Sequence, residues 1–166
     1  MAEKDKKLPF DPMDPQQNHL YEAELAVFPR KKDKFMSLEE LQVATDDILS
    51  RPWFRKAHPE VKKLTVKDGR GAKWSRIGDD TIHLLRVSRV RDVLIHEIIH
   101  HIVPGGTEWH GSVYCGMLLY FIGKLYDQKT KDRLRKTFKR ASPPIVWDKR
   151  LARFGDLDRA GKEGET

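Results

Sequence analysis

The sequence predicts an α+β fold in which a small antiparallel sheet of about three strands packs with several helices. Two observations carry this expectation. Apolar residues recur with helical spacing in both the early and the late parts of the chain, and three short β-like segments separated by turn sequences lie between them. Helices and strands in separate blocks are typical of the α+β class. The 166 residues, of which 39% are hydrophobic, suffice for one core.

The first part of the chain is expected to hold an arm and two helices. Residues 1–13 are charged and contain prolines without any periodicity, so we expect a flexible arm. A helix is predicted over residues 15–27. Ser37 and, three residues later, Glu40 form the sequence of a capping box, which starts a second helix. That helix should end near Pro52, because proline cannot continue a helix.

Three strands are predicted in the middle of the chain, over residues 63–67, 72–77 and 81–86. The segments 68–71 and 78–80 between them are rich in Gly and Asp and have the composition of turns. An edge of such a sheet can hold an extended peptide by adding it as a further strand. His83, in the third strand, is either a residue that touches such a peptide or an ordinary half-exposed histidine.

Three more helices are expected after the strands. The first carries His96 and should end at Pro104-Gly105-Gly106, since proline stops a helix and glycine favours the turn. The second begins after Trp109-His110-Gly111. A basic third helix runs from about residue 130 to 140 and is stopped by Pro143-Pro144.

The most informative motif is His96-Glu97-Ile98-Ile99-His100. Two histidines four residues apart on a helix share one face, with Cβ atoms about 5–6 Å apart, and this separation suits one metal ion. Glu97 falls beside that face, where a carboxylate can take a proton from water. Apolar residues cover the opposite arc of the helix, so one face would pack into the core and the other would carry the chemistry. The alternative is a pair of hydrogen-bonded core histidines.

A catalytic zinc site has three protein ligands and one open position, so a third ligand must come from outside the pentapeptide. His110 is predicted to supply it, because a short turn lets the next helix fold back beside the first. Glu108 is its main competitor, and an exposed histidine at a helix start is the alternative for His110. Tyr114, one turn later, could donate a hydrogen bond to an oxyanion or simply pack in the core. His101 lies too far round the helix to bind the same ion.

The run His96 to His101, followed by His110-Gly111-Ser112-Val113-Tyr114, resembles a family of zinc-dependent metallohydrolases of actinobacteria and their phages. The pattern of that family is HExxHH, a short loop with Gly and Pro, and HGxxF, and Tyr114 stands in place of the Phe. More distantly the run is similar to SprT-like metalloproteases. Over approximately residues 14–140 the resemblance also includes Gln16-Gln17, Tyr21-Glu22-Ala23-Glu24, Pro52-Trp53, Gly69-Arg70-Gly71-Ala72, Ile82-His83-Leu84 and Leu134-Arg135-Lys136-Thr137-Phe138. It implies a zincin-like fold, metal ligands at His96, His100 and His110, and Glu97 as catalytic base.

Motif and resemblance together predict a zinc-dependent metallohydrolase, in the first place a metallopeptidase that hydrolyses amide bonds of a peptide or protein substrate. Three neutral imidazoles leave the charge of a zinc ion uncompensated, which makes bound water acidic. One alternative is a non-catalytic structural zinc module, although such a module needs a fourth protein ligand and has no use for Glu97. The other alternative is a DNA-associated basic protein with SprT-like protease activity.

The net charge of +7 and the pI near 9.5 suggest a nucleic-acid partner. Positive charge is densest over residues 124–140, where Lys131, Arg135 and Lys139 are spaced to form one stripe on the basic helix. A solvated helix face is the usual explanation of such a run. The functional explanation is a weak, salt-sensitive contact with nucleic acid through this C-terminal helix.

Domain organisation and compartment follow from the same composition. Residues 14–141 are expected to form a single zincin-like domain, and residues 142–166 a basic and polar C-terminal extension. Cys115 is the one cysteine, which excludes an internal disulfide, and it is expected to be a small buried hydrophobe rather than a nucleophile. No signal peptide is expected, because the first residues are charged, and the longest apolar run is shorter than the about 20 residues that span a bilayer. We therefore expect a cytoplasmic protein that does not enter the membrane, in the host cytoplasm if a phage encodes it.

Overall fold

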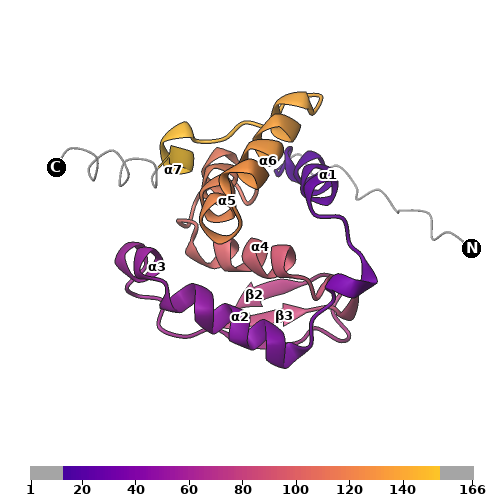
Figure 1. The fold of residues 1–166 in the computed structure, drawn as a ribbon, viewed down its shortest axis with the longest axis vertical. Helices are drawn as coiled ribbons and strands as arrows, with labels where there is room; N and C mark the ends of the chain where they lie inside the picture. Colours follow the sequence, from indigo (N-terminus) through magenta and orange to yellow (C-terminus); the bar gives the residue numbers. More distant parts are fainter. Residues whose placement is uncertain (1–12, 154–166) are drawn as a thin grey trace, which may run out of the picture. The chain divides into compact units, whose positions relative to one another are not determined.

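The computed structural model describes residues 13–153 (Figure 1). The chain is divided into two compact units. The helical unit comprises Met1–Val27 and Gly105–Thr166, and the sheet unit comprises Phe28–Pro104. Residues 14–141, which were expected to form one domain, are shared between these units. The expected arm before Met13 and the extension beyond residue 153 lie outside the described residues.

Helices open the sheet unit. A short 3-10 turn, η1 (Lys32–Lys34), precedes α2 (Leu38–Ser50). The predicted capping box is confirmed, because the Ser37 hydroxyl accepts a hydrogen bond from the Glu40 N–H at 3.1 Å and the Ser37 N–H donates to the Glu40 carboxylate at 2.7 Å. α2 ends before Pro52, as expected, but Pro52 then begins a further helix, α3 (Pro52–Ala57). Proline at the first helical position has no N–H to satisfy and a suitable φ, which explains this unexpected start.

The sheet consists of β1 (Thr65–Asp68), β2 (Arg76–Gly78) and β3 (Thr81–Leu84), in the order β1-β3-β2. β2 pairs antiparallel with β3, whereas β1 pairs parallel with β3. The prediction of an antiparallel sheet is therefore wrong for β1. β3 carries Ile82 and Leu84, which are both fully buried, and this strand takes the central position. The segment after β1 consequently leads past β3 to the opposite edge, where β2 pairs.

One face of the sheet packs against helices. β1 contacts α2, and β2 and β3 contact α4 (Arg91–Ile102), which follows the 3-10 turn η2 (Arg86–Ser88). Figure 1 shows α4 beside β2 and β3. Gln42 of α2 also covers the outer edge of β1. Its Oε1 accepts a hydrogen bond from the Val66 N–H at 2.8 Å, and its Nε2 donates to the Leu64 carbonyl at 2.9 Å. These contacts hold α2 and α4 on the apolar side of the sheet and leave the other side polar.

The helical unit contains α1 (Gln17–Val27), α5 (Ser112–Leu125), α6 (Gln128–Arg140) and α7 (Lys149–Arg153). α5 packs against α6 and α7, and α1 packs against α6 (Figure 1). The largest side chains of its core are fully buried: Leu20, Tyr114, Phe121, Leu134 and Phe138. The predicted helices over residues 15–27 and 130–140 are confirmed to within two residues.

α7 lies in the segment that was expected to be an extension. Ile145 and Ala152 of this segment are buried, and the Asp148 N–H donates to the Ser112 carbonyl at 2.7 Å. Residues 145–153 therefore pack on the helical unit. With helices and a small sheet, the α+β class is confirmed. No helix within the described residues has the length and apolar character needed to cross a membrane.

Candidate metal centre

α4 places the first two predicted ligands side by side. The helix ends at Ile102, before Pro104, as the sequence predicts. The Nε2 atoms of His96 and His100 are 3.1 Å apart, and their rings meet edge to face at an interplanar angle of 67°. Two nitrogens at about 2.0–2.1 Å from one zinc ion, at a tetrahedral angle, are about 3.3–3.4 Å apart. The two histidines are thus spaced for one ion to within a few tenths of an ångström.

The same spacing also fits a hydrogen bond between two neutral imidazoles, in which one ring donates and the other accepts. A proton and a metal ion therefore compete for the same pair of nitrogens.

Burial along α4 differs from an ordinary amphipathic helix. Leu94, Ile95, Ile98 and Ile99 are fully buried, as the apolar arc predicts, but His96 and Glu97 are each only 6% exposed. A carboxylate is rarely buried unless it is paired or hydrogen-bonded, because it loses its hydration. Glu97 is thus a buried carboxylate that directly follows His96 on α4.

His110 precedes α5 in the helical unit and is 2% exposed. Its Nδ1 lies 2.6 Å from Oδ2 of Asp14, whose side chain is 9% exposed. A carboxylate that accepts the Nδ1–H bond fixes the tautomer in which Nε2 carries the lone pair. Histidines that bind metal almost always donate their second N–H in this way. His110 thus has the surroundings of a ligand, and Asp14 is a site residue that the sequence analysis missed.

The backbone at His110 is held by Gln16 and Cys115. The Gln16 amide donates to the His110 carbonyl at 3.0 Å and to the Val146 carbonyl at 3.2 Å, while its oxygen accepts from the Val146 N–H at 2.6 Å. The Cys115 thiol donates to the His110 carbonyl at 3.4 Å. Gln16, from the residues before α1, and Cys115 of α5 therefore fix the position from which the His110 side chain extends.

Two tyrosine rings enclose the imidazole of His110. The ring centroids of Tyr21 and Tyr114 lie 5.3 and 5.1 Å from it, and both contacts are edge to face. Tyr114 is fully buried, so its ring packs in the core as one of the two interpretations requires. Its function as a hydrogen-bond donor to an oxyanion stays a prediction.

The turn before α5 explains two further features of the motif. The Gly111 N–H donates to the Glu108 carbonyl at 3.2 Å, and a Cβ atom at Gly111 would lie 2.8 Å from the Glu108 Cβ. Glycine is therefore needed for the turn to close. Glu108, the competing candidate for the third ligand, is exposed, in contrast to His110.

The remaining residues that the sequence singled out lie in other surroundings. His101 pairs with Asp80 across 3.3 Å, in keeping with its expected separation from the metal face. Cys115 is fully buried, and this burial raises the pKa of its thiol well above the ordinary value, as expected of a small core residue. In the predicted basic stripe, Lys131 is only 5% exposed and donates to the Ala152 carbonyl at 2.6 Å. Lys131 is thus part of the core rather than of a surface stripe.

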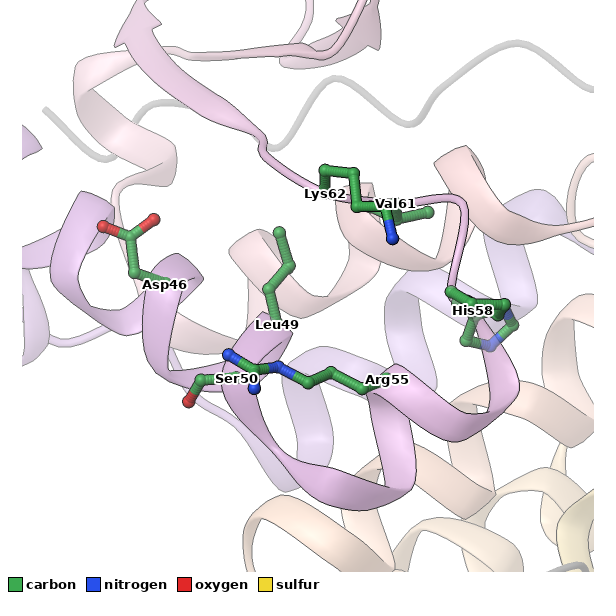
Figure 2. Close-up of a pocket in the computed structure, with 8 residues that line it drawn as sticks. Asp46, Leu49, Ser50, Arg55, His58, Val61 and Lys62 are labelled. Carbon is green, nitrogen blue, oxygen red and sulfur yellow. The ribbon is translucent and has the colours of Figure 1, made fainter.

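Two surface hollows contain none of the motif histidines. One of about 450 Å³ lies in the sheet unit beside α2 and α3, and Figure 2 shows Arg55 and Lys62 on opposite sides of it. The other, of about 640 Å³, is lined by residues of α1 and of the end of α6. Neither hollow adds a residue to the candidate metal centre.

The histidines that could hold a metal ion are His96 and His100 in the sheet unit and His110 in the helical unit. Each histidine offers one ring nitrogen, and imidazole suits zinc as well as other divalent transition metals. Comparisons with protein-family models, with curated proteins and with solved structures found no match.

Proposed function

We propose that the protein is a zinc-dependent metallohydrolase, and specifically a metallopeptidase, with His96, His100 and His110 as metal ligands and Glu97 as general base. The observation that carries the proposal is the spacing of His96 and His100, whose Nε2 atoms are 3.1 Å apart on a partly buried helix face. Two imidazoles whose ring nitrogens lie this close together on one helix face are typical of metal sites.

The donor set favours zinc with a catalytic function. Three nitrogen ligands match the three-histidine class of catalytic zinc sites, whereas structural sites use four protein ligands. When bound, zinc acts as a Lewis acid that lets water lose a proton near neutral pH. Asp14 supports the set from outside by accepting the Nδ1–H bond of His110, which keeps the opposite nitrogen unprotonated.

Glu97 is the residue that turns a binding site into a hydrolytic one. It follows His96 directly on α4 and is 6% exposed. A carboxylate at this position can accept a proton from the attacking water and return it to the leaving amine. A structural zinc module has no need of such a base.

The proposal is tested by measuring zinc content and peptidase activity in the same preparations. Wild type should hold one zinc ion and cleave peptides, while His96→Ala and His110→Ala should lose the metal. Glu97→Gln should keep the metal and lose about 10²–10⁴-fold in rate, the usual contribution of a positioned general base. Glu108→Gln, which changes an exposed glutamate near His110, is the matched control and should behave as wild type.

Two results would separate the alternatives. If the wild-type protein holds one zinc ion but cleaves nothing in a broad library of peptides and unfolded proteins, the site is a structural zinc module. A protein that cleaves without zinc, or with Glu97→Gln as active as wild type, would exclude the proposed chemistry altogether.

A further inference from the structure

The polar face of the sheet carries a row of basic side chains, one from each strand. His83 of β3 is in register with Lys67 of β1 and with Arg76 of β2. Paired residues on neighbouring strands point to the same face, and residues adjacent along a strand point to opposite faces. The row therefore lies on the side opposite to the buried Val66 and Ile82. Lys67 and Arg76 are exposed, and His83 is half-buried.

The loop of residues 69–75 extends this positive surface. It leaves the sheet next to the basic row, and its Arg70 and Lys73 are exposed. Trp74 is 52% exposed, and the Lys73 Nζ lies 5.2 Å from the centroid of its ring. An indole that is half exposed among cations has the features of a base-stacking platform, in which charged side chains follow a phosphate backbone and an aromatic ring holds a base.

Acidic residues are rare in the segment that carries this surface. Residues 62–76 contain six Lys and Arg residues and one acidic residue, Asp68. Asp68 is paired with Arg89 at 2.9 Å and with Arg70 at 3.5 Å. The next acidic residues, Asp79 and Asp80, occupy the turn at the other end of β3. The end of the sheet beside the loop is thus the basic end.

We propose that Lys67, Arg70, Lys73, Trp74 and Arg76, together the cationic face, bind single-stranded nucleic acid. The four cations contact phosphates, and Trp74 stacks on a base. Charge by itself fits any polyanion, but an exposed indole at the same surface favours a ligand that carries aromatic bases. A duplex keeps its bases stacked inside the helix, so stacking on Trp74 requires a single strand. This surface is distinct from the helix α6 that the sequence indicated, where Lys131 is buried.

The test measures fluorescence anisotropy of labelled 20-nucleotide dT and U strands at several salt concentrations. Lys67→Glu with Arg76→Glu should weaken binding at least about tenfold. Lys136→Glu with Lys139→Glu changes the net charge equally at exposed positions of α6 and should weaken it less than about threefold. The neutral pair Lys67→Ala with Arg76→Ala should lower the salt slope by about 1.4, since each phosphate contact with a single strand contributes about 0.7. The dT and U arms show whether the ligand is DNA, RNA or either.

Stacking is tested separately with Trp74→Ala. Loss of one base–aromatic stack should weaken dT binding roughly five- to 150-fold, but it should leave binding to an abasic strand of equal length unchanged. The proposal is overturned if wild type does not bind at 50 mM salt, if Trp74→Ala binds dT as tightly as wild type, or if the α6 pair has the larger effect. The proposal is also overturned if polyglutamate competes as effectively as dT, because the surface would then recognise negative charge alone.

The cationic face is independent of the proposed metal centre. Binding of nucleic acid should therefore be unchanged by a metal chelator and by Glu97→Gln. Each variant of the cationic face and of α6 should show the wild-type thermal unfolding curve. A peptidase that does not bind nucleic acid, or a nucleic-acid-binding protein that has no peptidase activity, would then refute one proposal and leave the other standing.

Discussion

Removing the Asp14 carboxylate should weaken metal binding while the fold is kept. Oδ2 of Asp14 lies 2.6 Å from Nδ1 of His110, and both side chains are buried. Loss of such an outer partner typically costs 10–100-fold in metal affinity, which corresponds to about 1.4–2.8 kcal/mol at 1.4 kcal/mol per factor of ten. Asp14→Asn keeps a carbonyl oxygen that can accept the Nδ1–H bond, so it should fall at the lower end of this range. Asp14→Ala should fall at the upper end.

The metal-free protein should respond in the opposite direction to Asp14→Asn. Oδ1 of Asp14 is buried and has no hydrogen-bond partner within the described part of the chain. A buried carboxylate loses more hydration than a neutral amide, so it costs more free energy in that state. The thermal midpoint without metal should therefore stay constant or rise, which a purely structural function of Asp14 does not predict.

Zinc affinity is measured by competition with a chromogenic chelator, and metal-free stability by thermal unfolding in EDTA. Nitrogen-15 NMR of His110 should show the Nδ1–H tautomer in wild type. Asp79→Asn is the matched control, because Asp79 is exposed in a turn with φ 48°, which asparagine tolerates. If both Asp14 variants bind zinc within twofold of wild type while His110→Ala binds weakly, Asp14 does not orient the ligand. If His110→Ala also binds normally, His110 is not a ligand.

Three further predictions concern packing and titration. A Cβ at Gly116 would lie 2.6 Å from the Asp148 carbonyl oxygen, so Gly116→Ala should cost about 1–3 kcal/mol in urea unfolding. A Cβ at Gly105 would have nothing within 4 Å, so Gly105→Ala should not change the stability. Equal stabilities of the Gly116→Ala and Gly105→Ala variants would contradict the packing of residues 145–153. The buried Cys115 thiol, with its raised pKa, should not react with Ellman's reagent at pH 8 until the protein unfolds, and rapid labelling of the native protein would show otherwise. Burial lowers the pKa of His58 below 6.5, although Glu60 opposes the shift. Its contribution to stability is therefore complete above about pH 6.5 and is lost as the pH falls through the lower pKa of the folded state. Between pH 5 and 7, the free energy of unfolding in urea should vary less with pH for His58→Gln than for wild type. An unchanged pH profile would refute the lowered pKa of His58.

Features that depend on near neighbours in the chain could be predicted from the sequence. The capping box of Ser37 and Glu40, the end of α4 before Pro104 and the shared face of His96 and His100 all follow from the geometry of one helical turn. Two helices, α3 and α7, were not predicted from the sequence. Pro52 was interpreted only as the end of a helix although it begins the next, and α7 forms where Ile145 and Ala152 find a surface to pack on.

Features that depend on distant parts of the chain needed the tertiary structure. The strand that gains most stability from having a neighbour on each edge takes the central position, and this strand is β3, between β1 and β2. Asp14 reaches His110 across 96 residues, a separation at which no periodicity relates two positions. The same holds for the row of Lys67, His83 and Arg76, which register across three strands creates. By itself the sequence determined which residues share a helix face and which chemistry that face offers, because both depend on bonds within a few residues. The tertiary structure alone decided what surrounds that chemistry, because packing brings together residues that the chain keeps far apart.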